Sequence, residues 1–170
     1  MKILVTLLLV VTCQSAMAQE LRAILLQLLH TTHHHEAWFV PANKAVEGLT
    51  AEQASWRDGN GNHSVGQLTY HIVFWNKGNL DHMQDKPTTQ PKSNEDTFDS
   101  FDEKQWEDLV KQLDQVMIDL EKFVLEADEK KLKEIASMIT NISTHNAYHV
   151  GQIIVVRKAQ KAWNPKKDDK

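Results

Sequence analysis

The stretch that decides the fold is Thr144–Arg157, which reads THNAYHVGQIIVVR. Its two histidines, His145 and His149, are four residues apart in a run whose apolar residues recur every three or four positions. On an α-helix this spacing places both imidazoles on one face, about one turn apart. That face is also the apolar one, and its predicted members are Ile135, Met138, Ile142, His145, His149, Ile153, Val156 and Trp163. We therefore predict a long helix with two histidines directed into a core.

A third histidine lies on a second amphipathic segment, residues 63–75, which reads HSVGQLTYHIVFW. His71 shares its predicted buried stripe with Leu68, Ile72 and Trp75, and Asn79 lies at the edge of that stripe. A buried imidazole needs a hydrogen bond or a metal ion. Three inward histidines from two helices would bind one divalent ion and leave coordination positions open, as catalytic sites do. The alternative is three core histidines that hydrogen-bond to protein groups, and we favour the metal because clustered buried imidazoles are costly.

The N-terminus has the pattern of a secretory signal peptide. Lys2 precedes an apolar run over residues 3–11, and Ala16-Met17-Ala18 supplies a cleavage motif before Gln19. The apolar run is too short to span a bilayer, so we predict a signal peptide at 1–18 and export to the periplasm or medium. A less favoured alternative is a lipoprotein anchored through Cys13, the only cysteine in the chain.

Composition excludes several classes of function. Without Lys2 the chain has 18 basic and 23 acidic side chains, a net charge of −5, and no basic stripe. Such a protein is a poor candidate for binding nucleic acid or anionic membranes. No second apolar run is long enough for a membrane span. A small molecule is the expected partner, and the sequence leaves open whether the protein forms a homodimer.

The remaining segments predict an all-α four-helix bundle over 19–165, followed by a disordered tail at 166–170. A first helix begins near Leu21, a restart or kink is expected at Pro41, and a capping box formed by Ser64 and Gln67 opens the helix of His71, which ends near Met83. A third helix carries Trp106, Leu109, Leu113, Val116, Leu120, Val124 and Ala127. The fourth helix follows a solvated turn at 128–131 and ends at Trp163-Asn164-Pro165.

Two regions are predicted to be solvated. The segment from Asp85 to Ser100 lacks apolar periodicity and is expected to be a mobile loop that can be trimmed. His33, His34 and His35 are interpreted as a solvent-exposed helix end, with a second metal site as a less favoured alternative. We also expect His63 and His82 to face solvent.

Together, HSVGQLTYHIVFW, the amphipathic helix led by Trp106 and THNAYHVGQIIVVRK before Trp163-Asn164-Pro165 resemble the DinB-like superfamily of four-helix bundles. The resemblance covers nearly the whole chain after the predicted signal peptide. It implies that His71, His145 and His149 bind one divalent ion, zinc or nickel in many relatives. It also implies that Gln152 is a pocket or packing residue and not a ligand. Relatives with known activities include metal-dependent thiol transferases that use bacillithiol or mycothiol, and related hydrolases.

Two functions therefore remain for the chain. The first is a metal-dependent hydrolase or thiol-transferase-like enzyme that acts on a small molecule. The second is a non-catalytic protein that binds a metal or a ligand. The spacing of the sequence identifies no catalytic residue. Glu36 is the only acid that we nominate as a general base, and a solvent-facing Glu36 is the favoured interpretation.

Overall fold

The computed structural model describes residues 2–98 and 103–163, and the side chains of 17–98 and 104–163. These residues form six α-helices, one short 3-10 helix and no β-strand. The long helices are α1 (Lys2–His33), α4 (Val65–Met83), α5 (Glu103–Glu126) and α6 (Glu129–Ala159), and the short elements are α2 (Ala42–Val46), α3 (Ala51–Ser55) and η1 (Asn94–Thr97). The predicted all-α class is confirmed.

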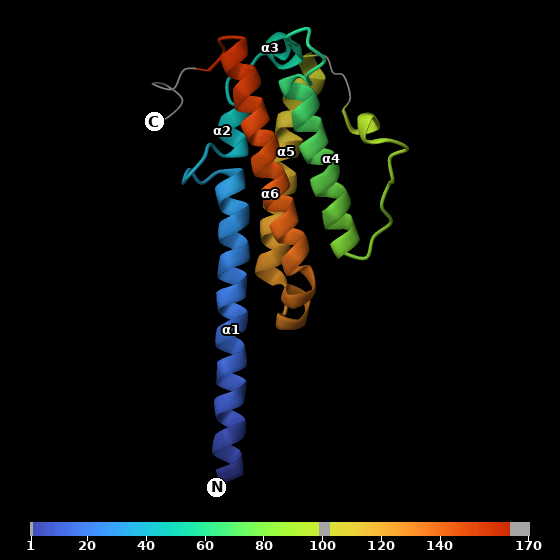
Figure 1. Ribbon diagram of the computed structural model, residues 1–170. Helices are drawn as coiled ribbons and strands as arrows, with labels where there is room; N and C mark the ends of the chain where they lie inside the picture. Colours follow the sequence, from blue (N-terminus) through green and yellow to red (C-terminus); the bar gives the residue numbers. More distant parts are fainter. Residues whose placement is uncertain (1, 99–102, 164–170) are drawn as a thin grey trace.

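The four long helices pack around one axis (Figure 1). Helices α1 and α4 each pack against both α5 and α6, so α1 and α4 lie on opposite sides of the pair. The chain runs in opposite directions in α4 and α6, and α2 and α3 lie at one end of the bundle. At the other end, the N-terminal part of α1 extends beyond the rest of the helices.

The buried apolar residues form two clusters, one towards each end of the bundle. One cluster lies beneath α2 and α3 and includes Ala45, Leu68, Ile72, Leu113, Val150 and Ile153. The other joins α1 to the far ends of α4, α5 and α6 and includes Leu25, Leu29, Leu80, Leu120, Leu132 and Ile139. Each long helix therefore buries an apolar stripe, as the sequence periodicity requires. The functional side chains described below lie where the two clusters meet.

Local capping chemistry decides where two of these helices begin. The predicted capping box of α4 is confirmed, because the Gln67 backbone N–H donates to Ser64 Oγ and the Ser64 N–H donates to Gln67 Oε1. At α6, Asp128 accepts a hydrogen bond from the Lys131 backbone N–H. The helix therefore begins at Glu129, and the predicted solvated turn at 128–131 is mostly its first turn.

The C-terminal end of α6 differs from the prediction. The helix ends at Ala159, Lys161 takes a positive φ of 61°, and Trp163 lies outside the helix. Trp163 instead packs against the guanidinium of Arg157, 4.8 Å from its ring centroid. Asn164 and Pro165 lie outside the described residues.

Arg157 is a buried cation that the sequence periodicity did not single out. Its guanidinium donates to the backbone oxygens of Ala45, Lys44 and Ala162. The Lys44 and Ala45 carbonyls lie near the end of α2, and the Ala162 carbonyl lies just after α6. The Arg157 side chain therefore connects α2 and the residues after α6 to the bundle. The hydrogen bonds satisfy the charge that burial would otherwise leave unpaired.

The prediction of a mobile, removable loop is wrong for the second half of the 85–100 segment. Residues Asn94–Thr97 form η1, Thr97 is fully buried, and Phe98 packs against the first apolar cluster. An Asp96 carboxylate that accepts from the Ser93 N–H closes the start of η1. Residues 99 and 100 lie outside the described part of the chain.

The prediction for the end of α1 is also partly wrong. Helix α1 continues through Thr32 to His33, and both of these side chains are buried. His34 and His35 are exposed, as expected. The reason for the difference is that polar groups of α5 face His33, and a pattern of apolar residues within α1 cannot show this.

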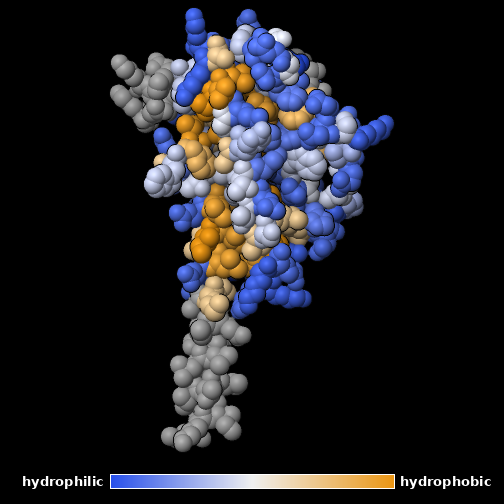
Figure 2. Space-filling model, in the orientation of Figure 1, coloured by the Kyte–Doolittle hydropathy of each residue, from blue (hydrophilic) through white to orange (hydrophobic). Residues whose placement is uncertain are grey.

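Some apolar surface stays exposed. Figure 2 shows such surface over α1 and over the C-terminal part of α6, where Ile24 is 50% and Val155 is 66% exposed. Within the described residues, no helix combines the length and the apolar character needed to cross a membrane.

Candidate metal centre

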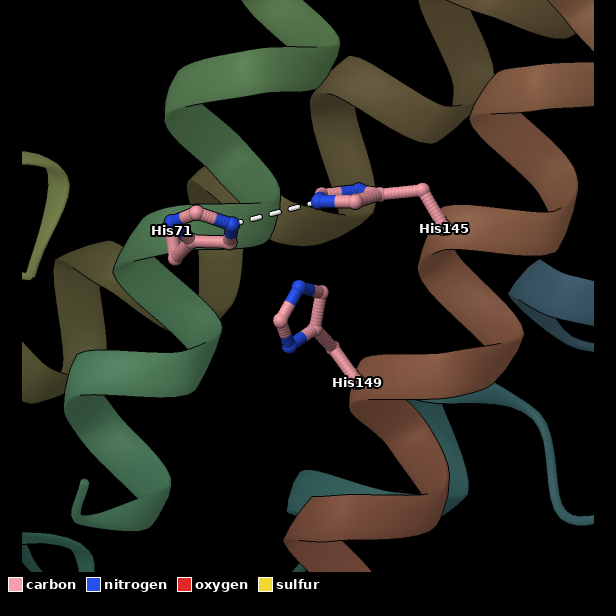
Figure 3. A group of neighbouring side chains, drawn as sticks. All are labelled: His71, His145 and His149. Atoms are coloured by element: carbon pink, nitrogen blue, oxygen red, sulfur yellow. Dashed lines mark hydrogen bonds between the residues drawn. The ribbon is translucent and has the colours of Figure 1, made fainter. Parts of the chain in front are cut away.

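Three imidazoles converge between α4 and α6. Figure 3 shows His71 on α4 facing His145 and His149 on α6, with one ring nitrogen of His149 directed towards the other two rings. The Nε2 atoms of His71 and His145 are 3.1 Å apart, and one nitrogen of each histidine lies within 4.8 Å of the others. His71 is 3% and His149 8% exposed, while His145 is half-buried. The convergence expected from the sequence is therefore present.

The site lies in a polar layer at the junction of the two apolar clusters. Asn76 and Asn146 are fully buried beside the histidines, and their amide N–H groups point at the sulfur of Met117, 3.2 and 3.4 Å away. In this part of α6 the most buried positions are thus Asn146 and Val150, one residue beyond each histidine. The buried stripe of α6 is thus displaced by one residue from the predicted one. The two histidines of α6 therefore lie at the edge of the core, and His145 lies near solvent.

Hydrogen bonding fixes the tautomer of His71. The Thr97 hydroxyl donates its one proton to the Asn94 carbonyl at 2.6 Å, so it accepts from Nδ1–H of His71, also at 2.6 Å. Nε2 of His71 is then unprotonated and presents a lone pair to the centre of the site. Holding one ring nitrogen of a histidine so that the other can act as a ligand is the usual arrangement in metal sites.

Gln152 fixes the tautomer of His149, as Thr97 fixes that of His71. Its amide N–H donates to the Tyr148 hydroxyl at 3.2 Å, which turns its carbonyl oxygen to His149 Nδ1 at 2.6 Å. Nδ1 therefore carries the proton and Nε2 of His149 is free to accept. Gln152 contacts a candidate ligand and is not itself one, as the sequence analysis expected.

The contact between His71 and His145 requires a cation or a proton. Two nitrogen lone pairs 3.1 Å apart repel each other, so with His71 Nε2 as acceptor the proton lies on His145 Nε2. A metal ion would take the place of that proton. Two nitrogens bound to one tetrahedral zinc ion lie about 3.3 Å apart, given Zn–N bonds of about 2.0–2.1 Å. The donor set of three imidazoles therefore fits a divalent ion such as zinc or nickel.

The electrostatics of the site favour neutral imidazoles. Burial lowers the pKa of His71 to about 3 and that of His145 to about 4, and the neighbouring His149 adds to both shifts. Burial also lowers the pKa of His149, although its hydrogen bond to Gln152 opposes the shift. Neutral imidazole is the form that binds metal, so the ligands need not lose a charge at neutral pH.

Aromatic stacking covers the outer side of His71. Phe98 lies between two imidazoles, with its ring centroid 4.2 Å from that of His71 and 3.7 Å from that of His63, and the planes are nearly parallel. His63 is therefore half-buried, and the expectation that it faces solvent is wrong, whereas His82 is exposed as expected. Thr97, the last residue of η1, and Phe98, the residue after it, are therefore part of the site.

A groove of about 530 Å³ leads away from His71 and His145 between α4 and α6. Its other lining residues are Trp75, Asn79, Asn94, Glu134, Ser137, Met138, Asn141 and Ile142. Among these described residues there is no lysine or arginine. Trp75 and Asn79 were expected on the stripe of His71, and the structure places both at this groove.

Glu36 is not part of the centre. It is exposed and lines a different groove, of about 810 Å³, together with Pro41 and Trp106. Sequence reasoning also missed Thr97 and Phe98. The one sequence feature of Thr97 and Phe98 is their position near the end of a polar segment. That position does not distinguish these two residues from their neighbours.

We predict that Thr97→Val disturbs the centre more than Thr97→Ser. Valine keeps the shape but removes the acceptor of His71 Nδ1–H, so His71 loses its fixed tautomer, while serine keeps the hydroxyl. Affinity for a divalent ion should fall about 10- to 100-fold in the valine variant. Nitrogen NMR of the imidazoles reports the tautomer, and competition with a chelating dye reports the affinity. Equal losses in both variants would instead assign Thr97 a packing role.

A second prediction concerns pH. Histidines in an unfolded chain have a pKa of about 6.5, whereas these three have lowered pKa values in the folded chain. Below about pH 6.5 the unfolded state binds more protons than the folded state. The free energy of unfolding should therefore fall as the pH is lowered from about 6.5 to about 4, and it should change little above pH 6.5. Urea unfolding with chelator present, repeated across this range, measures the effect.

The matched variants are His145→Gln, which should make the pH dependence shallower because two of the three histidines remain, and the exposed His82→Gln, which should leave it unchanged. A wild-type protein whose stability does not change between pH 4 and 7 would contradict the assignment of three neutral buried imidazoles.

Comparison with protein families places these features in a wider context. A family model described as the DinB superfamily matches residues 42–156, more than half of the chain. The matched residues include α4, α5 and α6 as far as Val156, and thus all three histidines of the centre. No curated protein and no solved structure matches the chain in the corresponding comparisons. The family match and the helical fold together show that the chain belongs to the DinB superfamily.

Proposed function

We propose that the protein binds one divalent metal ion through His71, His145 and His149 and acts as a metal-dependent enzyme on a small molecule. The observation that carries the proposal is the convergence of three neutral imidazoles at the end of an open groove. Hydrolysis and thiol transfer are the reaction classes that we favour. Zinc or nickel is the expected ion, because both bind imidazole nitrogen well.

Three protein ligands support a catalytic role over a closed structural one. Structural zinc sites use four protein ligands, whereas catalytic sites keep a position for water or substrate. When bound, a divalent ion supplies Lewis acidity, which polarises a carbonyl group or activates water or a thiol. The chain's own contribution is to hold the imidazoles neutral and correctly oriented through Thr97 and Gln152.

The groove indicates what kind of substrate would reach the centre. Trp75 and Met138 offer apolar contact, and Asn79 and Asn141 offer amide groups for hydrogen bonds. An anionic substrate would find no lysine or arginine among the described lining residues. We therefore infer that the part of the substrate in the groove is uncharged or cationic, since an anionic group would have only the metal ion itself for an ion pair.

No described acid lies where a general base is needed. Among the described residues that line the groove, Glu134 is the only carboxylate, and it precedes His145 by eleven residues, about 16 Å along the helix. Activation of the nucleophile would therefore depend on the ion itself. This feature also keeps the alternative function open, a non-catalytic protein that binds a metal or ligand in the same cavity.

The first test of the proposal is metal binding. Alanine at His71, His145 or His149 should lower the affinity for zinc by more than about a hundredfold, because each removes one of three protein ligands. The exposed His82→Ala is the matched control and should bind like the wild type. Competition with a chelating dye and elemental analysis measure the result. Ligand variants that bind zinc as tightly as the wild type would show that these histidines only fill the core.

A panel of hydrolase and thiol-transfer substrates then separates the enzyme from the binding protein. Activity that needs added metal and is lost in His149→Ala supports the enzyme. A protein that binds zinc tightly but turns over none of the panel supports the binding function.

We also propose that the protein is exported after cleavage behind Ala18. Support comes from the signal-like residues 2–18 and from the contacts of α1 that follow them. Among the described side chains of α1, Leu25 and Leu29 are buried in the second apolar cluster, and removal of the first eighteen residues would leave both in place. N-terminal sequencing of protein recovered from the periplasm or medium should begin at Gln19. An intact Met1 on cytosolic protein would contradict export.

A further inference from the structure

A second group of titratable side chains lies away from the three-histidine centre, where α1 meets α5. His33 is the last residue of α1 and is 3% exposed. Its Nδ1 is 2.7 Å from Glu121 Oε1, and its Nε2 is 2.9 Å from Asp114 Oδ1. Both ring nitrogens of a buried imidazole thus face carboxylate oxygens of α5.

Glu121 is the centre of this group. Its second oxygen is 3.7 Å from His30 Nε2, and its first oxygen is 3.8 Å from His34 Nδ1. One ligand atom each from His33, His34 and Glu121 lies within 4.8 Å of the other two. Imidazole nitrogen and carboxylate oxygen at such separations form a donor set for zinc and similar ions.

Asp114 orients His33 from the other side. The Asn43 amide donates to Asp114 Oδ1 at 2.6 Å, and the same oxygen lies against His33 Nε2. If Nε2 carries the proton, Nδ1 presents its lone pair towards Glu121. A metal-binding histidine generally donates its other N–H to a carboxylate in this way, which fixes the ring.

The negative charges of the Glu121 and Asp114 carboxylates also favour a bound cation. Glu121 and Asp114 bring two negative charges, and within the described residues their ion-pair partners are histidines, with no lysine or arginine among them. A single proton on His33 can serve both carboxylates only in part. A divalent ion would balance both charges while the imidazoles stay neutral.

We propose that His33, His34 and Glu121 form a second divalent-metal site, with Asp114 as the residue that positions His33. The site would be independent of the three-histidine centre and of any catalysis there. It would join the end of α1 to α5. Because the DinB superfamily match begins at residue 42, α1 lies outside it, and the ion would fasten this helix to the matched part of the chain.

The experiment uses full-length protein that carries His145→Ala and His149→Ala, which removes two ligands of the other centre. This variant should still take up one zinc ion per chain, measured by competition with a chelating dye. Adding His34→Ala or Glu121→Gln should lower the remaining affinity more than about tenfold, as loss of a ligand requires. His35→Ala, the exposed neighbour, is the matched control and should stay within about twofold of its parent.

These substitutions are chosen to preserve the fold. His34 has a side chain that is 48% exposed, and the amide introduced by Glu121→Gln keeps an oxygen that can accept from His33. The buried His33 is left in place. If the parent variant does not fold, the same two substitutions in the wild-type chain should reduce the zinc stoichiometry from two to one.

Two results would overturn the second site. One is a folded His145→Ala/His149→Ala protein that takes up no zinc at concentrations that saturate the wild type; the ion then belongs to the three-histidine centre alone. The other is zinc uptake that neither His34→Ala nor Glu121→Gln weakens, in which case His33 is only hydrogen-bonded between two carboxylates. If instead the wild type binds one ion and loses it only through His34→Ala or Glu121→Gln, the second site stands and the three-histidine proposal fails.

Discussion

The burial of three imidazoles between α4 and α6 is the constraint on which the rest of this structure depends. Each ring carries two nitrogens, and a nitrogen removed from water without a partner is costly. The chain meets this requirement with Thr97 for His71 and Gln152 for His149. Nε2 of His71 and Nε2 of His145 lie only 3.1 Å apart, and one nitrogen of each histidine lies within 4.8 Å of the others, which is the physical reason to expect a cation at their centre.

The same constraint explains why residues 94–98, which belong to the polar segment between α4 and α5, take a defined structure at the site. The Thr97 hydroxyl can accept from His71 only because its own proton goes to the Asn94 carbonyl, which requires the tight turn of η1. Phe98 then excludes water from the outer face of the ring by stacking between His71 and His63. The segment after α4 is thus a wall of the centre, although its composition resembles that of a solvated loop.

The two histidine groups of the protein differ in their electrostatics. The centre between α4 and α6 contains no carboxylate, so burial lowers the pKa values of its histidines and keeps them neutral. The group between α1 and α5 places His33 between the carboxylates of Glu121 and Asp114, whose two negative charges favour a cation. Neutral ligands leave a bound divalent ion with its full charge, whereas a carboxylate ligand reduces that charge.

The sequence by itself determined the helical class, the start of α4 at Ser64 and the helix face on which each of His71, His145 and His149 lies, because helical periodicity and capping are properties of residues close together in the chain. Only the tertiary structure decided which groups face those elements from elsewhere. Thr97 reaches His71 across 26 residues, and Asp114 and Glu121 reach His33 across more than 80. Contacts at such separations leave no periodic trace in the chain. For this reason His33 was expected to be solvated and residues 94–98 to be removable, whereas His33 is buried against α5 and Thr97 against α4.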